Sequence, residues 1–331
     1  MYETFYGLRE RPFELTPNPR FLFMTPSHRE ALTTLEYGLT ARTGIALLLG
    51  DAGTGKTTLV HAALQLQRSQ QGLAVYLNNP SLTRLEFVEF LAAGFGLSAD
   101  AARSKTRCLS DLTELLATRH AAGGMTALVI DEAQCLPDIL LEEVRLLANI
   151  ESASEKLLSI VLAGQPELSA RLSQPSLRQL KQRIGLRCAL APLDLADTAA
   201  YIAARVRTAG GEAAHLFEPG AVAAIHEHSR GIPRTISVIC DNALVSGFAL
   251  DRQTIDRDLV LEVCADFDLV GGADDAPDAG ALSYAVAEPE SAAVSDDGGA
   301  SRAESDGGLL TRLARHRRLS RFPESADRSR T

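Results

Sequence analysis

The feature that most constrains this chain is the run Gly50-Asp51-Ala52-Gly53-Thr54-Gly55-Lys56-Thr57-Thr58, which matches the Walker A pattern G-x-x-x-x-G-K-[ST]. Apolar residues 45–49 precede the run and predict a buried strand, and residues 57–67 predict a helix. In that setting backbone N–H groups turn toward a polyanion, and the helix N-terminus adds positive potential. Lys56 would reach the β- and γ-phosphates, and the Thr57 hydroxyl would hold Mg²⁺. The loop therefore predicts binding of a nucleoside triphosphate, with a solvated glycine-rich turn as the alternative.

A second motif, of the Walker B kind, indicates that the nucleotide is also hydrolysed. Residues 127–130 are apolar and end in Asp131 and Glu132. In a parallel sheet both strand ends open on the same edge, so Asp131 can reach the Mg²⁺ shell opposite Thr57. Glu132 is then placed to polarise the attacking water as a general base. The Asp-Glu pair favours an ATPase of the AAA+ or RecA kind over a GTPase, and a strand that ends on solvated acids is the alternative.

Composition indicates a globular protein and argues against several other classes. Hydrophobic residues make up 46% of the chain, and the longest apolar runs are of strand length, short of the roughly 20 residues of a membrane helix. The first residues lack the basic and apolar regions of a secretory signal. The five cysteines show no paired spacing and no histidine cluster completes a zinc site. We therefore expect a cytoplasmic protein without a transmembrane segment.

The pattern along the chain predicts an α/β fold with three ordered parts. Residues 1–40 form a lead-in rich in Phe and Pro, expected to pack on the ATPase core, with Ser27 and Glu30 as the capping box of its helix. Residues 41–193 alternate strands and helices, which predicts a five-stranded parallel sheet with helices on both faces. The strands are expected at 45–49, 73–77, 127–131, 158–163 and 187–191. Residues 194–268 read as helices only and predict a small all-helical lid domain.

The remaining residues, 269–331, lose this periodicity and predict a disordered tail. Residues 271–307 contain nine acidic residues and one basic residue, Arg302. A segment of this composition cannot bury enough apolar surface to fold. Residues 308–321 are basic and could form a short amphipathic helix that docks on a partner or on an acidic membrane surface, with a solvated basic tail as the alternative. Once the charges of residues 271–331 are set aside, the net charge of −9 leaves a mildly acidic folded part, which argues against a dedicated nucleic-acid binder.

A sheet with a phosphate loop on its first strand, followed by a helical lid, is the arrangement of an AAA+ module, and further polar residues fit it. Gln165 ends the strand expected between the two motif strands, where it could hydrogen-bond the attacking water; an ordinary loop residue is the alternative. Arg234 begins a lid helix and could fold over the phosphates, or form a surface salt bridge. The basic segment 176–184 contains a candidate arginine finger, a residue that would enter the site of a neighbouring subunit. Arg183 is the first candidate and Arg178 the alternative. In a third interpretation neither arginine is a finger.

Several motifs together resemble a known family over about residues 1–268. They are Pro12-Phe13-Glu14-Leu15-Thr16-Pro17-Asn18-Pro19, His28-Arg29-Glu30-Ala31-Leu32, Asp131-Glu132-Ala133-Gln134, Leu162-Ala163-Gly164-Gln165-Pro166-Glu167-Leu168, Gln182-Arg183-Ile184 and Gly231-Ile232-Pro233-Arg234. They resemble the AAA+ ATPases of the general secretion pathway protein A (ExeA/GspA) type, whose free-standing relatives serve pilus and exosortase-linked exopolysaccharide loci. The resemblance implies ATP, Mg²⁺, self-assembly and energy delivered to a cell-envelope assembly.

The resemblance also sets the expectations for the ends of the chain. The secretion members continue into a membrane-spanning helix and a periplasmic peptidoglycan-binding domain, whereas residues 269–331 contain no apolar span. The free-standing relatives are therefore the better match. In AAA+ modules the segment before the first strand helps to line the adenine pocket, so Phe13 or Leu15 could do so here. Packing of the lead-in against the sheet edge is the alternative.

The predicted function is that of a Mg-ATP-dependent AAA+ ATPase that forms a ring-like homo-oligomer and supports export or assembly of a cell-envelope polymer. Its expected location is the cytoplasm, with peripheral contact at the inner membrane through the basic tail. The alternatives are a DNA-transaction ATPase similar to TniB- or MuB-type transposition regulators, and a slow nucleotide-dependent switch or scaffold.

Overall fold

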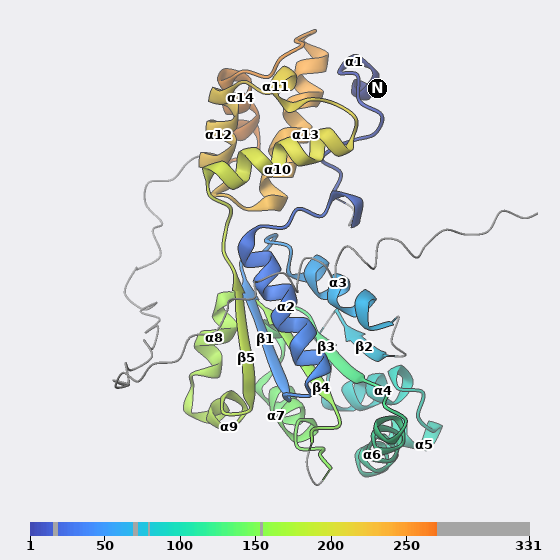
Figure 1. Ribbon diagram of the computed structural model, residues 1–331. Coiled ribbons are helices and arrows are strands. Elements are labelled where there is room, and N and C mark those ends of the chain that lie inside the picture. Colours follow the sequence, from blue (N-terminus) through green and yellow to red (C-terminus); the bar gives the residue numbers. More distant parts are fainter. Residues whose placement is uncertain (16–18, 69–71, 79, 153–154, 270–331) are drawn as a thin grey trace, which may run out of the picture. The chain divides into compact units, whose positions relative to one another are not determined.

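A parallel sheet organises the middle of the chain in the computed structural model (Figure 1). The strands are β1 (Ile45–Gly50), β2 (Leu73–Leu77), β3 (Thr126–Ile130), β4 (Ser159–Gly164) and β5 (Ile184–Leu190), in the order β2-β3-β4-β1-β5. All four strand pairs are parallel, so the predicted five-stranded parallel sheet is confirmed. The order places β4 between β3 and β1, as expected from the motifs. Strand β5 begins at Ile184 rather than at residue 187.

The structure describes residues 1–15, 19–68, 72–78, 80–152 and 155–269. The predicted disorder of the tail beyond residue 269 and the predicted helix at 308–321 lie outside the described residues. Among the described helices, none combines the length and the apolar character that a membrane crossing needs.

The two faces of the sheet are covered by different helices, because successive strand side chains point to opposite faces. Ala46 and Leu48 pack with α2 (Pro26–Thr40) and α3 (Lys56–Arg68) on one face. Ile45 and Leu47 pack on the other face. The helices of that second face are α4 (Arg84–Gly94), α5 (Ala99–Arg103), α6 (Lys105–Ala121), α7 (Asp138–Leu147), α8 (Pro166–Leu172) and α9 (Arg178–Lys181). Every residue of β1, β3 and β4 is buried, which explains why these strands read as unbroken apolar runs.

A third hydrophobic cluster joins the start of the lead-in to the lid helices. The lid helices are α10 (Leu195–Thr208), α11 (Ala213–Leu216), α12 (Pro219–Ser229), α13 (Pro233–Ala249) and α14 (Arg257–Asp266). The lead-in contributes the short helix α1 (Tyr2–Phe5) and the 3-10 turn η1 (Pro19–Phe21). Phe13 is fully buried in this cluster, with its ring centroid 6.0 Å from that of Phe217. The lead-in is therefore divided: its first part packs on the lid helices, and only α2 packs on the sheet.

Arg205 on α10 holds the lead-in in place. Its guanidinium donates to the carbonyl oxygens of Pro12 at 2.6 Å and Glu14 at 3.0 Å, and it lies over the Phe21 ring, 5.0 Å from the centroid. A cation over an aromatic ring contributes about 0.5–2 kcal/mol, so one side chain satisfies backbone acceptors and packs the aromatic residues together.

The start of α2 differs from the capping box predicted at Ser27 and Glu30. The N-cap is Thr25, whose Oγ1 accepts from the backbone N–H of His28, and Pro26 takes the first helical position. Proline is favoured there because its missing N–H has no intrahelical partner anyway.

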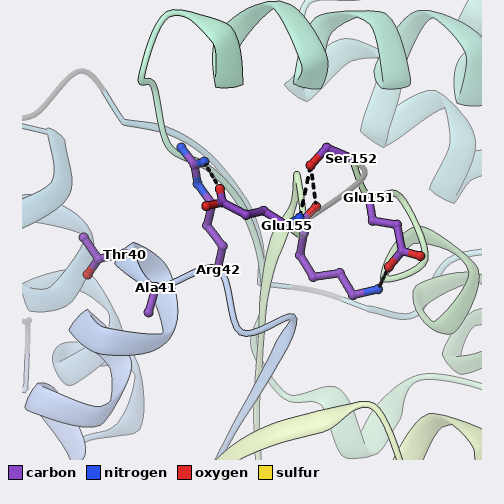
Figure 2. Close-up of a pocket in the computed structure, with 7 residues that line it drawn as sticks. Thr40, Ala41, Arg42, Glu151, Ser152 and Glu155 are labelled. Atoms are coloured by element: carbon purple, nitrogen blue, oxygen red, sulfur yellow. Dashed lines mark hydrogen bonds and ion pairs between the residues drawn. The ribbon is translucent and has the colours of Figure 1, made fainter.

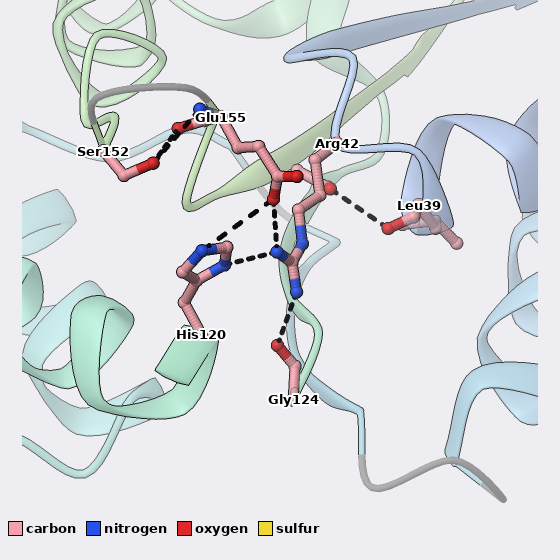
Figure 3. A network of polar contacts seen from close by, with 7 residues as sticks. Leu39, Arg42, His120, Gly124, Ser152 and Glu155 are labelled. Carbon is pink, nitrogen blue, oxygen red and sulfur yellow. Dashed lines mark hydrogen bonds and ion pairs between the residues drawn. The ribbon is translucent and has the colours of Figure 1, made fainter. Parts of the chain in front are cut away.

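A polar network ties the amino ends of the strands together. Arg42 precedes β1 and donates to His120 Nδ1, to Glu155 Oε2 at 2.7 Å and to the carbonyl oxygen of Gly124 at 3.4 Å (Figure 3). A polar hollow of about 500 Å³ lies here, with Arg42 and Glu155 facing one another (Figure 2). Neither the loop residues 50–58 nor Asp131, Glu132 and Gln165 line it, because they lie at the opposite edge of the sheet.

Gly231 adopts a backbone conformation that allows α13 to begin beside the connection from β5. Its φ is +71°, its carbonyl oxygen accepts from Leu193 N–H at 2.8 Å, and a Cβ placed on it would lie 2.0 Å from the Leu193 carbonyl oxygen. Both the backbone conformation and the close approach therefore require glycine at this position.

We expect Gly231→Ala to destabilise the protein by more than the roughly 1–2 kcal/mol of left-handed strain alone, because the new methyl group also displaces the Leu193 backbone. Gly123→Ala is the matched control, since Gly123 has φ +76° and open space around its Cβ position. Urea unfolding of both variants measures the difference, and equal losses of stability would contradict the steric argument.

Candidate active site

The loop between β1 and α3 is built to surround an anion. Gly53 and Gly55 have φ of +84° and +100°, which turn successive backbone N–H groups inward. Lys56 is 4% exposed, and its Nζ donates to the carbonyl oxygens of Gly50 at 2.7 Å and Asp51 at 2.9 Å. Burial lowers the pKa of Lys56, while the nearby Glu132 and Asp131 carboxylates act in the opposite direction. The ammonium group therefore sits at the mouth of the loop, held by neutral carbonyl groups that a phosphate can replace.

A cavity of about 470 Å³ opens directly beside this loop. Its walls come from the lead-in (Glu14, Leu15, Phe21, Leu22, Phe23, His28), the loop and α3 (Ala52, Gly53, Thr54, Gly55, Lys56, Thr57, Thr58), Glu132, and the lid (Leu193, Tyr201, Arg205, Pro233, Arg234, Ser237). The volume lies within the range of small-molecule and cofactor sites. The predicted loop residues 52–58 line it directly, whereas Gly50 and Asp51 contact Lys56.

Asp131 is placed beside Thr57, as the parallel sheet predicts. The Thr57 hydroxyl donates to Asp131 Oδ2 at 2.6 Å, and Tyr76 on β2 donates to the same oxygen at 2.7 Å. Burial and the hydrogen bond to Asp131 raise the pKa of Tyr76, so its hydroxyl stays protonated and donates. A hydroxyl and a carboxylate side by side at the edge of a phosphate loop are hard oxygen donors that fit Mg²⁺. The contact from Tyr76 was not anticipated, because its position in β2 carries no motif.

Glu132 and Gln165 are brought together at the ends of β3 and β4. Gln165 Nε2 donates to Glu132 Oε2 at 3.5 Å, and Gln134 Nε2 donates to the same oxygen at 2.6 Å. Glu132 has φ of +49°, which turns its side chain out of the strand direction and toward the cavity that it lines. The arrangement places a carboxylate and an amide next to the loop, where a water molecule could be held by both.

Arg234 joins the lid to the loop. Its backbone N–H donates to the Gly53 carbonyl oxygen at 3.3 Å, and its side chain lines the cavity. A Cβ on Gly53 would lie 2.7 Å from the Arg234 Cβ, so only glycine allows this close approach of α13. Arg234 is therefore within reach of whatever occupies the loop.

Arg178 and Arg183 lie away from this cavity. Arg178 is exposed at the start of α9, and Arg183 is half-buried just before β5. Because Ile184 pairs with Ile45, Arg183 lies at the amino end of the strands, at the opposite edge from the loop. Neither arginine lines the cavity of its own chain, and an action on a neighbouring subunit stays a prediction.

The lead-in supplies a contact that the motifs did not reveal. His28 is buried, with Nδ1 2.6 Å from Thr25 Oγ1 and Nε2 3.1 Å from the Thr54 carbonyl oxygen, so it ties the start of α2 to the phosphate loop. Of the two lead-in residues expected to line a nucleotide pocket, Leu15 lines this cavity. Phe13 does not line it and packs on the lid instead of the sheet edge.

Comparisons with known proteins agree with this fold. The AAA domain family matches residues 40–172. The ORC2 protein of Aeropyrum pernix in ADPNP-ADP complexes superposes with a TM-score of 0.59 at 17% identity, over 78% of this chain and 72% of that one. The Drosophila ORC bound to DNA gives 0.57 at 20% identity, over 78% of this chain and 64% of that one. These likenesses show the fold, and this chain is a P-loop protein of the AAA+ class.

A curated relative narrows this class further. The chain is 43% identical over 249 residues to general secretion pathway protein A of Aeromonas hydrophila, which covers 75% of this chain and 45% of that protein. The predicted resemblance to the family of general secretion pathway protein A is therefore confirmed. The chain spans less than half the length of this relative.

We expect Lys56→Ala to weaken binding of a fluorescent ATP analogue by about 100-fold, because charge-assisted hydrogen bonds to the phosphates contribute about 1.5–3 kcal/mol each. Equilibrium titration measures this affinity. Lys181→Ala, at an exposed lysine on α9, is the control. Unchanged affinity in Lys56→Ala would mean that the loop does not hold the phosphates.

We expect Tyr76→Phe to raise the Mg²⁺ concentration needed for half-maximal Mg²⁺-dependent nucleotide binding by about 10- to 100-fold, as loss of a group that orients a metal-site carboxylate commonly does. Titration of the analogue's binding with Mg²⁺ tests this without any turnover. Tyr37→Phe, at an exposed tyrosine on α2, is the matched control. An identical Mg²⁺ requirement in both variants would contradict the role of the Tyr76 hydroxyl.

Proposed function

We propose that this protein is a Mg²⁺-dependent ATPase that hydrolyses ATP to ADP and phosphate. The observation that carries the proposal is the convergence of the loop, the Thr57–Asp131 pair and Glu132 on one edge of the sheet. Both acids lie at the end of one strand and the loop follows another. That arrangement puts phosphate-binding and water-activating groups on the same side of a bound nucleotide.

Each residue has one role in the proposed reaction. The loop N–H groups and Lys56 bind the β- and γ-phosphates. Thr57 and Asp131 would hold Mg²⁺, which would neutralise phosphate charge. Glu132 accepts the proton of the attacking water, and the Gln165 amide orients that water. Arg234 contacts the phosphates from the lid and so makes the lid sensitive to the nucleotide.

The proposed active form is a homo-oligomer of the ring-like kind. Arg183, with Arg178 as the alternative, enters the site of a neighbouring subunit as an arginine finger. Neither arginine lines the cavity of its own chain, which supports this assignment. A finger supplied in trans contributes about 10³–10⁵ in rate in other nucleotide hydrolases, so an isolated monomer turns over slowly.

The proposed work of the ATPase is to support export or assembly of a cell-envelope polymer by secretion, pilus or exopolysaccharide machinery. The 43% identity with a general secretion pathway protein supports this assignment. The similarity to ORC proteins concerns the fold alone, so a role on DNA is kept as an outcome of the assay below. Peripheral contact with the inner membrane through residues 308–321 stays part of the proposal.

We expect the ATPase rate per molecule to rise with protein concentration and to be unaffected by double-stranded DNA. Glu132→Gln should keep ATP bound but lower turnover by about 10²–10⁴-fold, since the general base is lost while the phosphate contacts remain. Light scattering of this variant with ATP should report an increase in mass. Strong stimulation by DNA would favour a DNA-transaction ATPase instead.

We expect Arg183→Ala to bind ATP as the parent protein does and to lose the dependence of the rate on concentration. Arg178→Ala is the paired variant that distinguishes the two candidate fingers. If both variants keep the concentration dependence, neither arginine acts in trans.

A further inference from the structure

Gln134 makes two side-chain contacts that the proposed reaction does not yet use. It lies in the 3-10 turn η2 (Ala133–Cys135), immediately after the two acids of β3. Its Nε2 donates to Glu132 Oε2 at 2.6 Å, and its Oε1 accepts from the backbone N–H of Gln165 at 3.0 Å. One side chain therefore joins the candidate general base to the end of β4.

The chemistry of these partners determines which way the amide points. A backbone N–H can only donate, so the group that faces Gln165 must be the amide oxygen. The NH₂ group then faces Glu132, whose ionised carboxylate can only accept. The contact needs a donor and an acceptor on the same side chain, which is what a glutamine provides and a glutamate or an alanine does not.

Two further features hold the amide in this place. A Cβ on Gly164 would lie 2.9 Å from Gln134 Oε1, so the absent side chain at the end of β4 leaves the space that the amide occupies. The carbonyl oxygen of Gln134 also accepts from Arg171 Nη1 on α8 at 2.6 Å, and Arg171 pairs with Asp138 at the start of α7. Both ends of the residue are thereby attached to the surrounding elements.

We infer that Gln134 is a positioning residue that holds the Glu132 carboxylate in a set orientation relative to β4 and Gln165. Glu132 itself adopts a left-handed backbone conformation, which turns its side chain toward the cavity, but its rotatable side-chain bonds leave the direction of its carboxylate open. A displacement of a reacting group by about 1 Å can cost about 100-fold in rate. Gln134 thus acts on turnover and leaves the phosphate-binding loop untouched. The inference rests on the proposed ATPase function.

The test compares Gln134→Ala and Gln134→Glu with the parent protein in the full-length chain. Gln134→Glu keeps the size of the side chain and an oxygen that can accept from the Gln165 N–H. It replaces the NH₂ group, which donates to Glu132, by a carboxylate oxygen that cannot donate. We expect kcat to fall by about 10- to 100-fold in both variants. The affinity for a fluorescent ATP analogue should stay within about threefold of the parent value. Gln253→Ala, at an exposed glutamine of the lid, is the matched control and should change neither quantity.

The outcomes separate this inference from the function on which it depends. If the parent protein does not hydrolyse ATP at any concentration, the proposed function fails. If the parent is active and both Gln134 variants keep its kcat, the positioning role is wrong. A parallel loss of nucleotide affinity and kcat in both variants would also overturn it, because that pattern indicates a general structural role. A fall in kcat alone, with a thermal midpoint close to that of the parent, supports it.

Discussion

The parallel alignment of β3, β4 and β1 is the constraint on which the rest of the structure depends. Because Ile45 and Leu128 both pair with Ile160, the three strands run in step and leave the sheet at one edge. The polar site residues are concentrated there, since strands buried on both faces carry mainly apolar side chains along their length. The phosphate loop, the two acids and Gln165 are near one another because these strand ends are adjacent.

The cavity depends on a second constraint, the attachment of the lead-in to the lid. Phe13 and Phe21 belong to the same hydrophobic cluster as the lid helices, and Arg205 secures them to α10. The same lead-in supplies Leu15, Phe21 and Phe23 to the cavity wall, and the lid supplies Arg234. A bound nucleotide would therefore touch the sheet on one side and a combined wall of lead-in and lid on the other. Any change in lid position would move that whole wall.

Three polar groups of the site are each held by a residue outside the Walker A and Walker B patterns. Tyr76 donates to Asp131, Gln134 donates to Glu132, and His28 contacts the Thr54 carbonyl group. Such contacts orient the groups to which the proposed reaction assigns roles, and a buried acceptor left without its donor costs about 1–3 kcal/mol. They explain how the two carboxylates after β3 and the loop after β1 keep a set geometry.

The amino-acid sequence by itself determined the class of fold, the five strands, the helical lid, the phosphate loop, and the two acids, Asp131 and Glu132, at the end of β3. These follow from local patterns: apolar runs, strand–helix alternation and a glycine-rich loop that matches the Walker A pattern. The identity of the N-cap of α2, the lid-side packing of Phe13, and the contacts of Tyr76, His28 and Gln134 were decided only by the tertiary structure. The N-cap depends on a local choice between neighbouring hydroxyl residues. The other contacts depend on side chains from elements far apart in the chain, and the periodicity of one element carries no information about its contacts with another.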